Sequence, residues 1–221
     1  MSRDRPTVSA GGSAPRGKDA QRARGRLFIL SAPSGAGKST LCAMLRERLP
    51  GLRYSISYTT RPPRPGEIDG ENYFFIDEAA FKDGIAQGRW AEWARVHGHY
   101  YGTASAFIDR MLDRGHDLLL DIDVQGAAQL VAQYPRAVTI FIMPPSMEVL
   151  RQRLEKRGTD SAEAIARRLR NAAGEMAACS RYRHMVVNQR LERAVDDLLA
   201  ILAPDDCGAD DASTAPPMRG D

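Results

Sequence analysis

Short apolar runs alternate with amphipathic segments through the central part of the chain. The apolar runs cover residues 27–30, 117–123, 138–142 and 184–187, and a weaker one covers 54–57. Nearly continuous apolar runs of this length are typical of strands that are buried on both faces of a parallel sheet. We therefore predict a strand at each of these places.

The segments between these runs repeat their apolar side chains at helical spacing. Helices are expected over residues 41–49, 104–112, 124–134 and 191–202. Strands that alternate with helices in this way predict a doubly wound α/β fold with right-handed crossovers. Ligands of such folds bind beyond the carboxyl ends of the parallel strands, so the functional residues are expected there.

A glycine-bearing turn joins the first predicted strand to the first predicted helix. In this context a glycine-rich loop binds phosphate, because its backbone N–H groups and the helix N-terminus form an anion site. Lys38 would reach the β- and γ-phosphates of a nucleotide, and the Ser39 hydroxyl would bind Mg²⁺. The residues expected to contact ATP here are Ala32, Pro33, Ser34, Gly35, Ala36, Gly37, Lys38, Ser39 and Thr40.

Ala32 stands where the usual pattern of such a loop has its first glycine. A side chain is tolerated there only if the backbone keeps a negative φ, whereas Gly35 and Gly37, which lie nearer the phosphate, are retained. The alternative interpretation is a glycine-rich turn that carries a surface lysine. The strand and the helix on either side favour phosphate binding.

Two regions interrupt the alternation of strands and helices. Residues 57–105 combine Thr, Arg, Pro, Gly and aromatic residues in short alternating runs, which predicts a small mixed-β lobe inserted into the sheet domain. Residues 146–181 have a helical pattern rich in arginine, and Asp160 followed by Glu163 predicts a capping box for the second helix there. Charge runs usually form a solvated face. Beside a phosphate loop, we expect instead a lid that closes over the transferring phosphoryl group.

The bulk composition excludes several classes of protein. The length of 221 residues suffices for one α/β domain with inserted lobes, and the net charge of +3 gives no evidence for a nucleic-acid partner. Cys42, Cys179 and Cys207 are widely spaced, so neither a zinc site nor a disulfide framework is expected, and a cytoplasmic location is the simplest interpretation. No apolar run approaches the ~20 residues that span a bilayer, so no membrane contact is expected. The sequence does not define an oligomeric state.

Both ends of the chain differ in composition from the folded unit, which is expected over residues 25–203. Residues 1–24 are rich in Arg, Ser, Gly and Pro, residues 204–221 are acidic and contain Pro, and both tails are expected to be disordered. An arginine-rich leader would also suit an organellar transit peptide, but glycines and a proline within it interrupt any amphipathic helix.

The segment from Ser57 to Tyr73, Ser-Tyr-Thr-Thr-Arg-Pro-Pro-Arg-Pro-Gly-Glu-Ile-Asp-Gly-Glu-Asn-Tyr, closely resembles the signature of guanylate kinases. The glycine loop, residues 92–103, residues 120–126 and the arginines between 153 and 168 follow in the order of that family. A phosphate loop alone occurs in many folds, but these blocks together are specific, and the resemblance covers roughly residues 26–200. It implies an enzyme that phosphorylates GMP to GDP with ATP and Mg²⁺.

The resemblance also implies roles for residues of the lobe. Those that match positions around the GMP phosphate are Arg61, Arg64, Tyr73 and Tyr101. Those that match positions around the guanine base are Ser57, Glu92, Thr103 and Asp123. Guanidinium groups suit a dianionic phosphate because charge-assisted bonds are strong. Guanine offers N1–H and an amine as donors, so a carboxylate suits it, whereas adenine would present an acceptor to Glu92. Without its neighbours, Glu92 would be interpreted as a surface carboxylate of an edge strand.

On the ATP side, the resemblance implies ligands for the phosphates and for Mg²⁺. Asp121 ends a predicted strand in the manner of a Walker B acid and is expected to hold Mg²⁺, directly or through water, together with Ser39. Asn188 lies where the family contacts adenine, although the following residue, often an acid in the family, is Gln189. The other expected catalytic residues are Lys38, Arg153, Arg157 and Arg168. No general base is expected, because the acceptor is already an ionised phosphate.

Two other functions are compatible with parts of this pattern. Guanylate-kinase-like domains of scaffold proteins bind phosphorylated peptides without catalysis, but they typically lose parts of the phosphate loop and the lid arginines, which this chain retains. A kinase for another nucleoside monophosphate would share the loop, and here the carboxylates Glu92 and Asp123 argue against AMP.

Overall fold

The computed structural model describes residues 24–96, 98–156, 158 and 161–203. The two tails expected from the sequence lie outside these residues, apart from Arg24. The expected disorder of the tails therefore stays a prediction.

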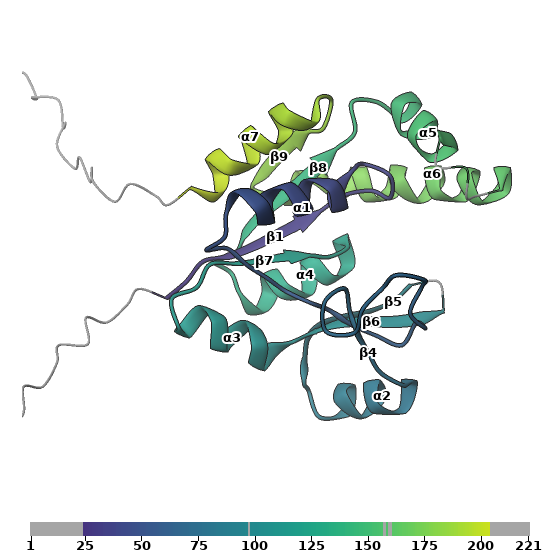
Figure 1. Ribbon diagram of the computed structural model, residues 1–221. Coiled ribbons are helices and arrows are strands. Elements are labelled where there is room, and N and C mark those ends of the chain that lie inside the picture. The colour runs from purple at the N-terminus through teal and green to yellow at the C-terminus, as the bar shows by residue number, and fades with distance from the viewer. Residues whose placement is uncertain (1–23, 97, 157, 159–160, 204–221) are drawn as a thin grey trace, which may run out of the picture.

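A five-stranded parallel sheet forms the centre of the fold (Figure 1). Its strands are β1 (Leu27–Ser31), β2 (Arg53–Tyr54), β7 (Leu118–Asp121), β8 (Val138–Met143) and β9 (His184–Val187), in the order β2-β7-β1-β8-β9. Every residue of β1 is buried, because this strand is central in the sheet and is covered on both faces. That burial explains why its sequence reads as a continuous apolar run.

Helices cover both faces of this sheet, as Figure 1 shows. On one face lie α1 (Lys38–Arg48) and α7 (Leu191–Leu202), and on the other lie α3 (Ser105–Asp113) and α4 (Val124–Gln133). This is the doubly wound α/β arrangement predicted from the sequence. Because parallel strands end at the same edge of the sheet, the segments after β1, β7 and β9 meet there.

A second, four-stranded sheet forms a separate lobe. Its strands are β3 (Tyr58–Thr59), β4 (Phe74–Phe75), β5 (Trp90–Val96) and β6 (His99–Ala104), in the order β4-β3-β6-β5, with β3 and β4 parallel and the other pairs antiparallel. The helix α2 (Glu78–Ala86) packs on it through Phe81, whose ring stacks on Trp90 and Tyr100. The lobe therefore has a small aromatic core of its own.

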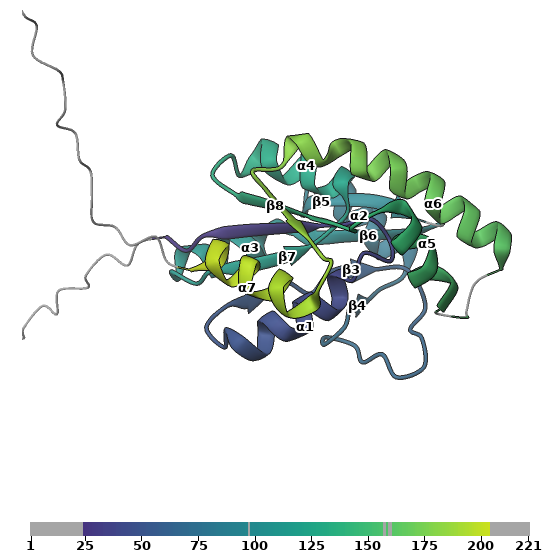
Figure 2. The same cartoon turned by 90° about the horizontal axis from the view of Figure 1, so that it is seen from above.

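A helical pair forms the arginine-rich region. It consists of α5 (Met147–Lys156) and α6 (Ala162–Ala177), followed by the short 3-10 helix η1 (Ala178–Arg181). The two α-helices pack on each other through a buried cluster of Leu150, Leu154, Leu169 and Ala172. In the view from above, both lie on the right-hand side of the molecule, away from α3 and α7 (Figure 2). These helices lie within residues 146–181, where a lid was expected, and the closing role of this region stays a prediction.

One sequence-based expectation for secondary structure was wrong, and one helix was missed. The strand predicted over 54–57 is divided between two sheets: Ser55 N–H still donates to Leu119 of the core, at 3.0 Å, whereas the Ser57 carbonyl already accepts from Phe74 of the lobe, at 2.9 Å. The helix α2 was not predicted, because it contains Gly84 and buries only one large side chain, Phe81.

The predicted cap of the second lid helix is also corrected. The N-cap of α6 is Ser161, whose side chain accepts a hydrogen bond from the Ala164 N–H. Asp160, the residue predicted to cap this helix, lies outside the described residues. Serine and aspartate are both favourable caps, so composition alone did not fix the starting residue.

Candidate active site

The phosphate loop runs from the end of β1 to the start of α1, and its glycines have the conformation that the motif requires. Gly35 and Gly37 have φ of 92° and 95°, a left-handed conformation that favours glycine. Asn188, at the end of β9, donates its side-chain N–H to the Ala36 carbonyl at 2.8 Å. Arg153 of α5 donates to the same carbonyl at 3.3 Å and to the Asn188 carbonyl at 2.8 Å. The loop is therefore held from both the sheet and α5.

Lys38 and Asp121 form an ion pair where the loop meets the end of β7. Lys38 also donates to the Ile122 carbonyl at 3.2 Å, and the Tyr54 hydroxyl donates to Asp121 at 3.1 Å. Burial lowers the pKa of Lys38, but the Asp121 carboxylate outweighs this and leaves the pKa raised. Lys38 therefore remains a cation, as a ligand for phosphate must.

A hollow of about 310 Å³ lies between the loop and the lobe. Besides apolar residues, it is lined by Lys38, Ser39, Ser57, Tyr73, Glu92, Tyr101, Asp121, Asp123 and Glu175. A neighbouring hollow of about 560 Å³ adds Arg61, Arg64 and Arg153 to the residues of the loop. The fold thus brings residues of both the expected ATP side and the expected GMP side to one place.

Glu92 lies on β5 with only 5% of its surface exposed. One of its carboxylate oxygens accepts a hydrogen bond from the Thr103 hydroxyl at 2.7 Å. Burial raises the pKa of Glu92 to about 7, the Thr103 bond opposes this rise, and the charge of Asp123 adds to it. The surface-carboxylate interpretation of Glu92 is excluded by its burial, although β5 does lie at the edge of the four-stranded sheet.

Asp123 follows β7 and caps α4. Its Oδ1 atom accepts the backbone N–H groups of Gln125 at 2.9 Å and Gly126 at 2.8 Å. These bonds fix the orientation of a carboxylate that lines the same hollow as Glu92. Glu92 and Asp123 therefore face one small space, which suits a ligand rich in hydrogen-bond donors.

Arg61 is held by Glu67, a residue to which the sequence reasoning assigned no role. Its guanidinium forms two bonds to the Glu67 carboxylate, at 2.8 and 2.9 Å, and lies 5.5 Å from the ring centre of Tyr73. The bond to Glu67 raises the pKa of Arg61, and the same bond lowers the pKa of Glu67. The Arg64 backbone N–H also donates to Glu67, at 2.7 Å, while Arg64 is itself exposed. The cations predicted to bind a phosphate thus sit on one short turn.

The structure describes two of the three arginines that were predicted for the lid. Arg153 contacts the phosphate loop through the bonds described above. Arg168, on α6, lines a hollow with Ser34 and Asp123. Arg157 lies outside the described residues. The roles assigned to all three stay predictions.

Glu175, near the end of α6, was missed by the sequence reasoning. It borders both hollows, and its Oε2 atom is buried without a hydrogen-bond partner among the described residues. Burial raises the pKa of Glu175, and the Ser34 backbone N–H opposes that rise. Because one glutamate in a charged amphipathic helix is unremarkable, the sequence held no signal for its position.

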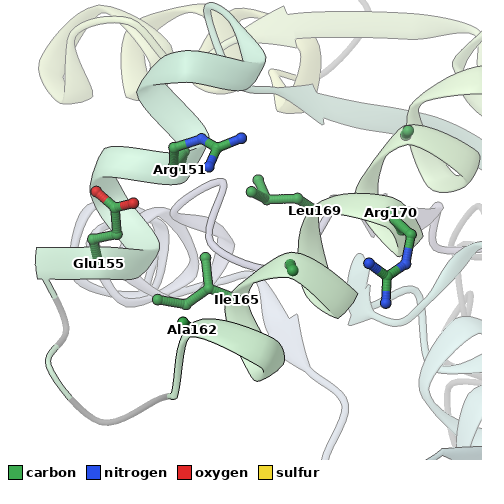
Figure 3. Close-up of a pocket in the computed structure, with 8 residues that line it drawn as sticks. Arg151, Glu155, Ala162, Ile165, Leu169 and Arg170 are labelled. Carbon is green, nitrogen blue, oxygen red and sulfur yellow. The ribbon is translucent and has the colours of Figure 1, made fainter.

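A larger hollow, about 730 Å³, lies between α5 and α6 (Figure 3). Apolar side chains such as Ile165 and Leu169 line it, with Arg151 and Glu155 at the α5 side. None of the predicted site residues that the structure describes borders this hollow. Volume alone therefore does not locate the site, and the convergence of charged groups at the phosphate loop does.

Two features are absent from the residues that the structure describes. Among the residues that the structure describes, no three His, Cys, Asp or Glu side chains gather closely enough to hold a metal ion by themselves. None of the helices within the described ranges has the length and apolar character needed to cross a bilayer.

Comparison with known proteins gives one consistent family. A model of the guanylate kinase family matches residues 24–204. A guanylate kinase of Syntrophotalea carbinolica is 51% identical over 185 residues, which cover 84% of this chain and 88% of that protein. A guanylate kinase of Caldanaerobacter subterraneus subsp. tengcongensis is 46% identical over 187 residues, which cover 85% of this chain and 91% of that protein.

A solved structure agrees with these sequence matches. The crystal structure of guanylate kinase from Anaplasma phagocytophilum superimposes with a TM-score of 0.67 at 34% identity, over 82% of this chain and 86% of that chain. The resemblance noted in the sequence is therefore confirmed over nearly the whole described unit, and the chain belongs to the guanylate kinase family.

Proposed function

We propose that this chain transfers the γ-phosphoryl group of ATP to GMP, giving ADP and GDP. The observation that carries the proposal is the buried carboxylate of Glu92, bonded to Thr103, in the same hollow as Lys38 of the phosphate loop. Membership of the guanylate kinase family supports the same reaction. A non-catalytic scaffold, one of the two alternative functions, would not need Glu92 and Lys38 to border the same hollow.

Glu92 accounts for base selection by hydrogen bonding. An ionised carboxylate can accept from the guanine N1–H and from the exocyclic amine, and Thr103 holds one of its oxygens in place. Adenine would bring its N1 lone pair against the same carboxylate and leave a buried acceptor unpaired, which is unfavourable. Asp123, whose orientation is fixed by its bonds to α4, faces the same space.

The chemical step requires positioning more than acid–base catalysis. An oxygen of the GMP phosphate forms a bond to the γ-phosphorus of ATP, and the bond from that phosphorus to the β–γ bridging oxygen breaks. Lys38, which belongs to the phosphate loop, and Arg153, which donates to the Ala36 carbonyl of that loop, would stabilise the charge on the oxygens of the transferring group. Arg61 and Arg64 would hold the acceptor phosphate after Glu67 releases Arg61.

The residues present fit a Mg²⁺ ion bound with the nucleotide. Ser39 and Asp121 line the same hollow and offer a hydroxyl and a carboxylate, the hard oxygen ligands that Mg²⁺ prefers, with nucleotide phosphates and water completing its coordination. Asp121 is held by Tyr54 and Lys38, so its position is fixed before any metal arrives. When bound, the ion would neutralise charge on the β- and γ-phosphates.

The proposed reaction also sets the expected partners. ATP and GMP are the proposed substrates, neither nucleic acid nor membrane is required, and the cytoplasm is the proposed location. Recycling of GMP into the purine nucleotide pool is the corresponding metabolic role.

A coupled assay of ADP production tests the proposal. The protein is incubated with ATP, MgCl₂ and each of GMP, AMP, CMP and UMP, and the GMP reaction is repeated with EDTA in excess over Mg²⁺. We expect turnover with GMP alone and its loss in EDTA. Turnover with another monophosphate would overturn the base assignment and leave the phosphate loop in place. Nucleotide binding without turnover would favour the scaffold function.

A further inference from the structure

One face of α4 is turned toward the lobe and bonds to the backbone of β5. Gly126, Gln129 and Gln133 are spaced three and four residues apart, so they lie on the same side of the helix. The Gln129 side chain accepts from the Trp93 N–H at 3.1 Å and donates to the Trp93 carbonyl at 2.8 Å. The Gln133 side chain donates to the Ala91 carbonyl at 2.6 Å. We call Gly126, Gln129 and Gln133 the α4 face.

These bonds complete an edge that has no neighbouring strand. β5 pairs with β6 on one side only, so the outward N–H and C=O groups of its residues need other partners. The carboxamide of Gln129 supplies both a donor and an acceptor to one residue, as a residue of an adjacent strand would. The bonded residues, Ala91 and Trp93, are the two neighbours of Glu92. The α4 face therefore fixes the backbone on both sides of the buried carboxylate.

The third member of the face leaves room for that carboxylate. A β-carbon placed on Gly126 would lie 2.5 Å from the Glu92 Oε2 atom and 3.5 Å from the Asp123 Oδ1 atom. Glycine within a helix is otherwise unfavourable, because it loses the most backbone entropy on folding. Its presence in the first turn of α4 is explained by the close approach of Glu92 to the helix.

We propose that the α4 face positions Glu92 for reading guanine and so sets the base specificity of the enzyme. The proposal rests on the proposed function. A carboxylate discriminates best when it accepts the guanine N1–H and the exocyclic amine together, and a displaced carboxylate loses one of these bonds. Gln129 and Gln133 act through Glu92 and do not line the hollow themselves, so they are positioning residues.

The first experiment compares the unchanged protein with Gln129→Leu in steady-state kinetics. The substrates are GMP and inosine monophosphate, which keeps the N1–H but lacks the amine. We expect the KM for GMP to rise roughly tenfold, the value of one lost net hydrogen bond, with the KM for ATP changed less than twofold. The preference for GMP over inosine monophosphate in kcat/KM should fall. Gln152→Leu, an exposed change of the same type on α5, is the matched control and should alter neither KM.

A double-mutant cycle separates a positioning role from a merely structural one. If Gln129 acts through Glu92, then Gln129→Leu should change the KM for GMP less than twofold in a Glu92→Ala background. A tenfold effect that persists in that background would overturn the proposal, as would an unchanged preference for GMP in the single variant. Gln133→Leu, at a more exposed position, gives the same measurement with a smaller expected change should Gln129→Leu not fold.

The activity of the unchanged protein distinguishes failure of the proposed role of the α4 face from failure of the proposed function. Turnover of GMP by the unchanged protein together with an unaffected Gln129→Leu would overturn the role of the α4 face alone. Absence of GMP turnover in the unchanged protein would overturn the proposed function and this inference with it. Gly126→Ala adds an independent arm, because its methyl group meets the Glu92 carboxylate directly, and an unchanged KM for GMP in this variant would count against the proposal.

Discussion

The burial of Glu92 predicts a specific dependence of stability on pH. The pKa of this carboxyl group rises from 4.5 to about 7 in the folded protein because it is buried. Between these values the folded state holds a proton that the unfolded state has released. The free energy of unfolding therefore falls as the pH rises through this window. Above pH 7, in the absence of nucleotide, Glu92 is ionised and lowers the free energy of unfolding by the full effect of this pKa shift.

Glu92→Gln removes this contribution while keeping an acceptor for the Thr103 hydroxyl. Each pKa unit corresponds to about 1.4 kcal/mol, so a shift of this size changes the unfolding free energy by about 2 to 3 kcal/mol between pH 5 and pH 8. The variant is thus expected to gain stability relative to the unchanged protein as the pH rises. Its GMP turnover should fall, because a neutral carboxamide presents only one acceptor to guanine.

Urea unfolding without nucleotide at pH 5, 6, 7 and 8 measures this difference. The chain has 2 tryptophans, Trp90 and Trp93, both on β5 beside Glu92, so their fluorescence reports on the relevant strand. Only the difference between variant and unchanged protein is interpreted, because other groups titrate in both. Glu47→Gln, the same exchange at an exposed position of α1, is the control. A difference for Glu92→Gln that varies no more with pH than that of the control would refute the desolvation argument.

Three further predictions follow from bonds in the structure. Lys38→Ala should lower kcat by at least about a hundredfold, because it removes a charged ligand of the phosphate. Its far-UV circular dichroism spectrum should be unchanged, and normal turnover would refute the assignment of the phosphate loop. Asn188→Ala removes a buried donor to the Ala36 carbonyl, so it should lower the unfolding free energy by about 1 to 2 kcal/mol and raise the KM for ATP, and an unaltered KM would contradict this role. Ser161→Ala removes the cap of α6 and should destabilise its first turn by about 1 kcal/mol, seen as faster amide exchange at Ala164, whereas unchanged protection would argue against the cap.

The sequence determined the architecture of the core because its signals are local. Strands such as β1 and β8 are buried on both faces, so each reads as an apolar run, and helices such as α7 carry one apolar stripe. The phosphate loop was also evident, since its glycines must adopt a left-handed backbone and therefore appear in the sequence as glycine. The positions of apolar residues and glycines along the chain were enough to predict each of these elements.

Elements whose stability depends on distant partners were not predicted correctly. The helix α2 is held by the stacking of Phe81 on Trp90 and Tyr100, which its own sequence does not show. The extended segment after β2 could not be assigned to two sheets, because its hydrogen-bond partners, Leu119 and Phe74, lie far along the chain. Short segments have little intrinsic preference, so tertiary contacts decide their structure.

The chemical state of the site residues was decided by tertiary structure alone. Without its neighbours in the sequence, Glu92 would be interpreted as a surface carboxylate of an edge strand, whereas in the folded protein it is buried and its pKa is raised. The charges of Arg61 and Glu67 are likewise brought together only when the turn between them has formed. A sequence lists which groups are present, whereas the free energy of a charge depends on its solvent and its neighbours, and these are defined only when the chain has folded.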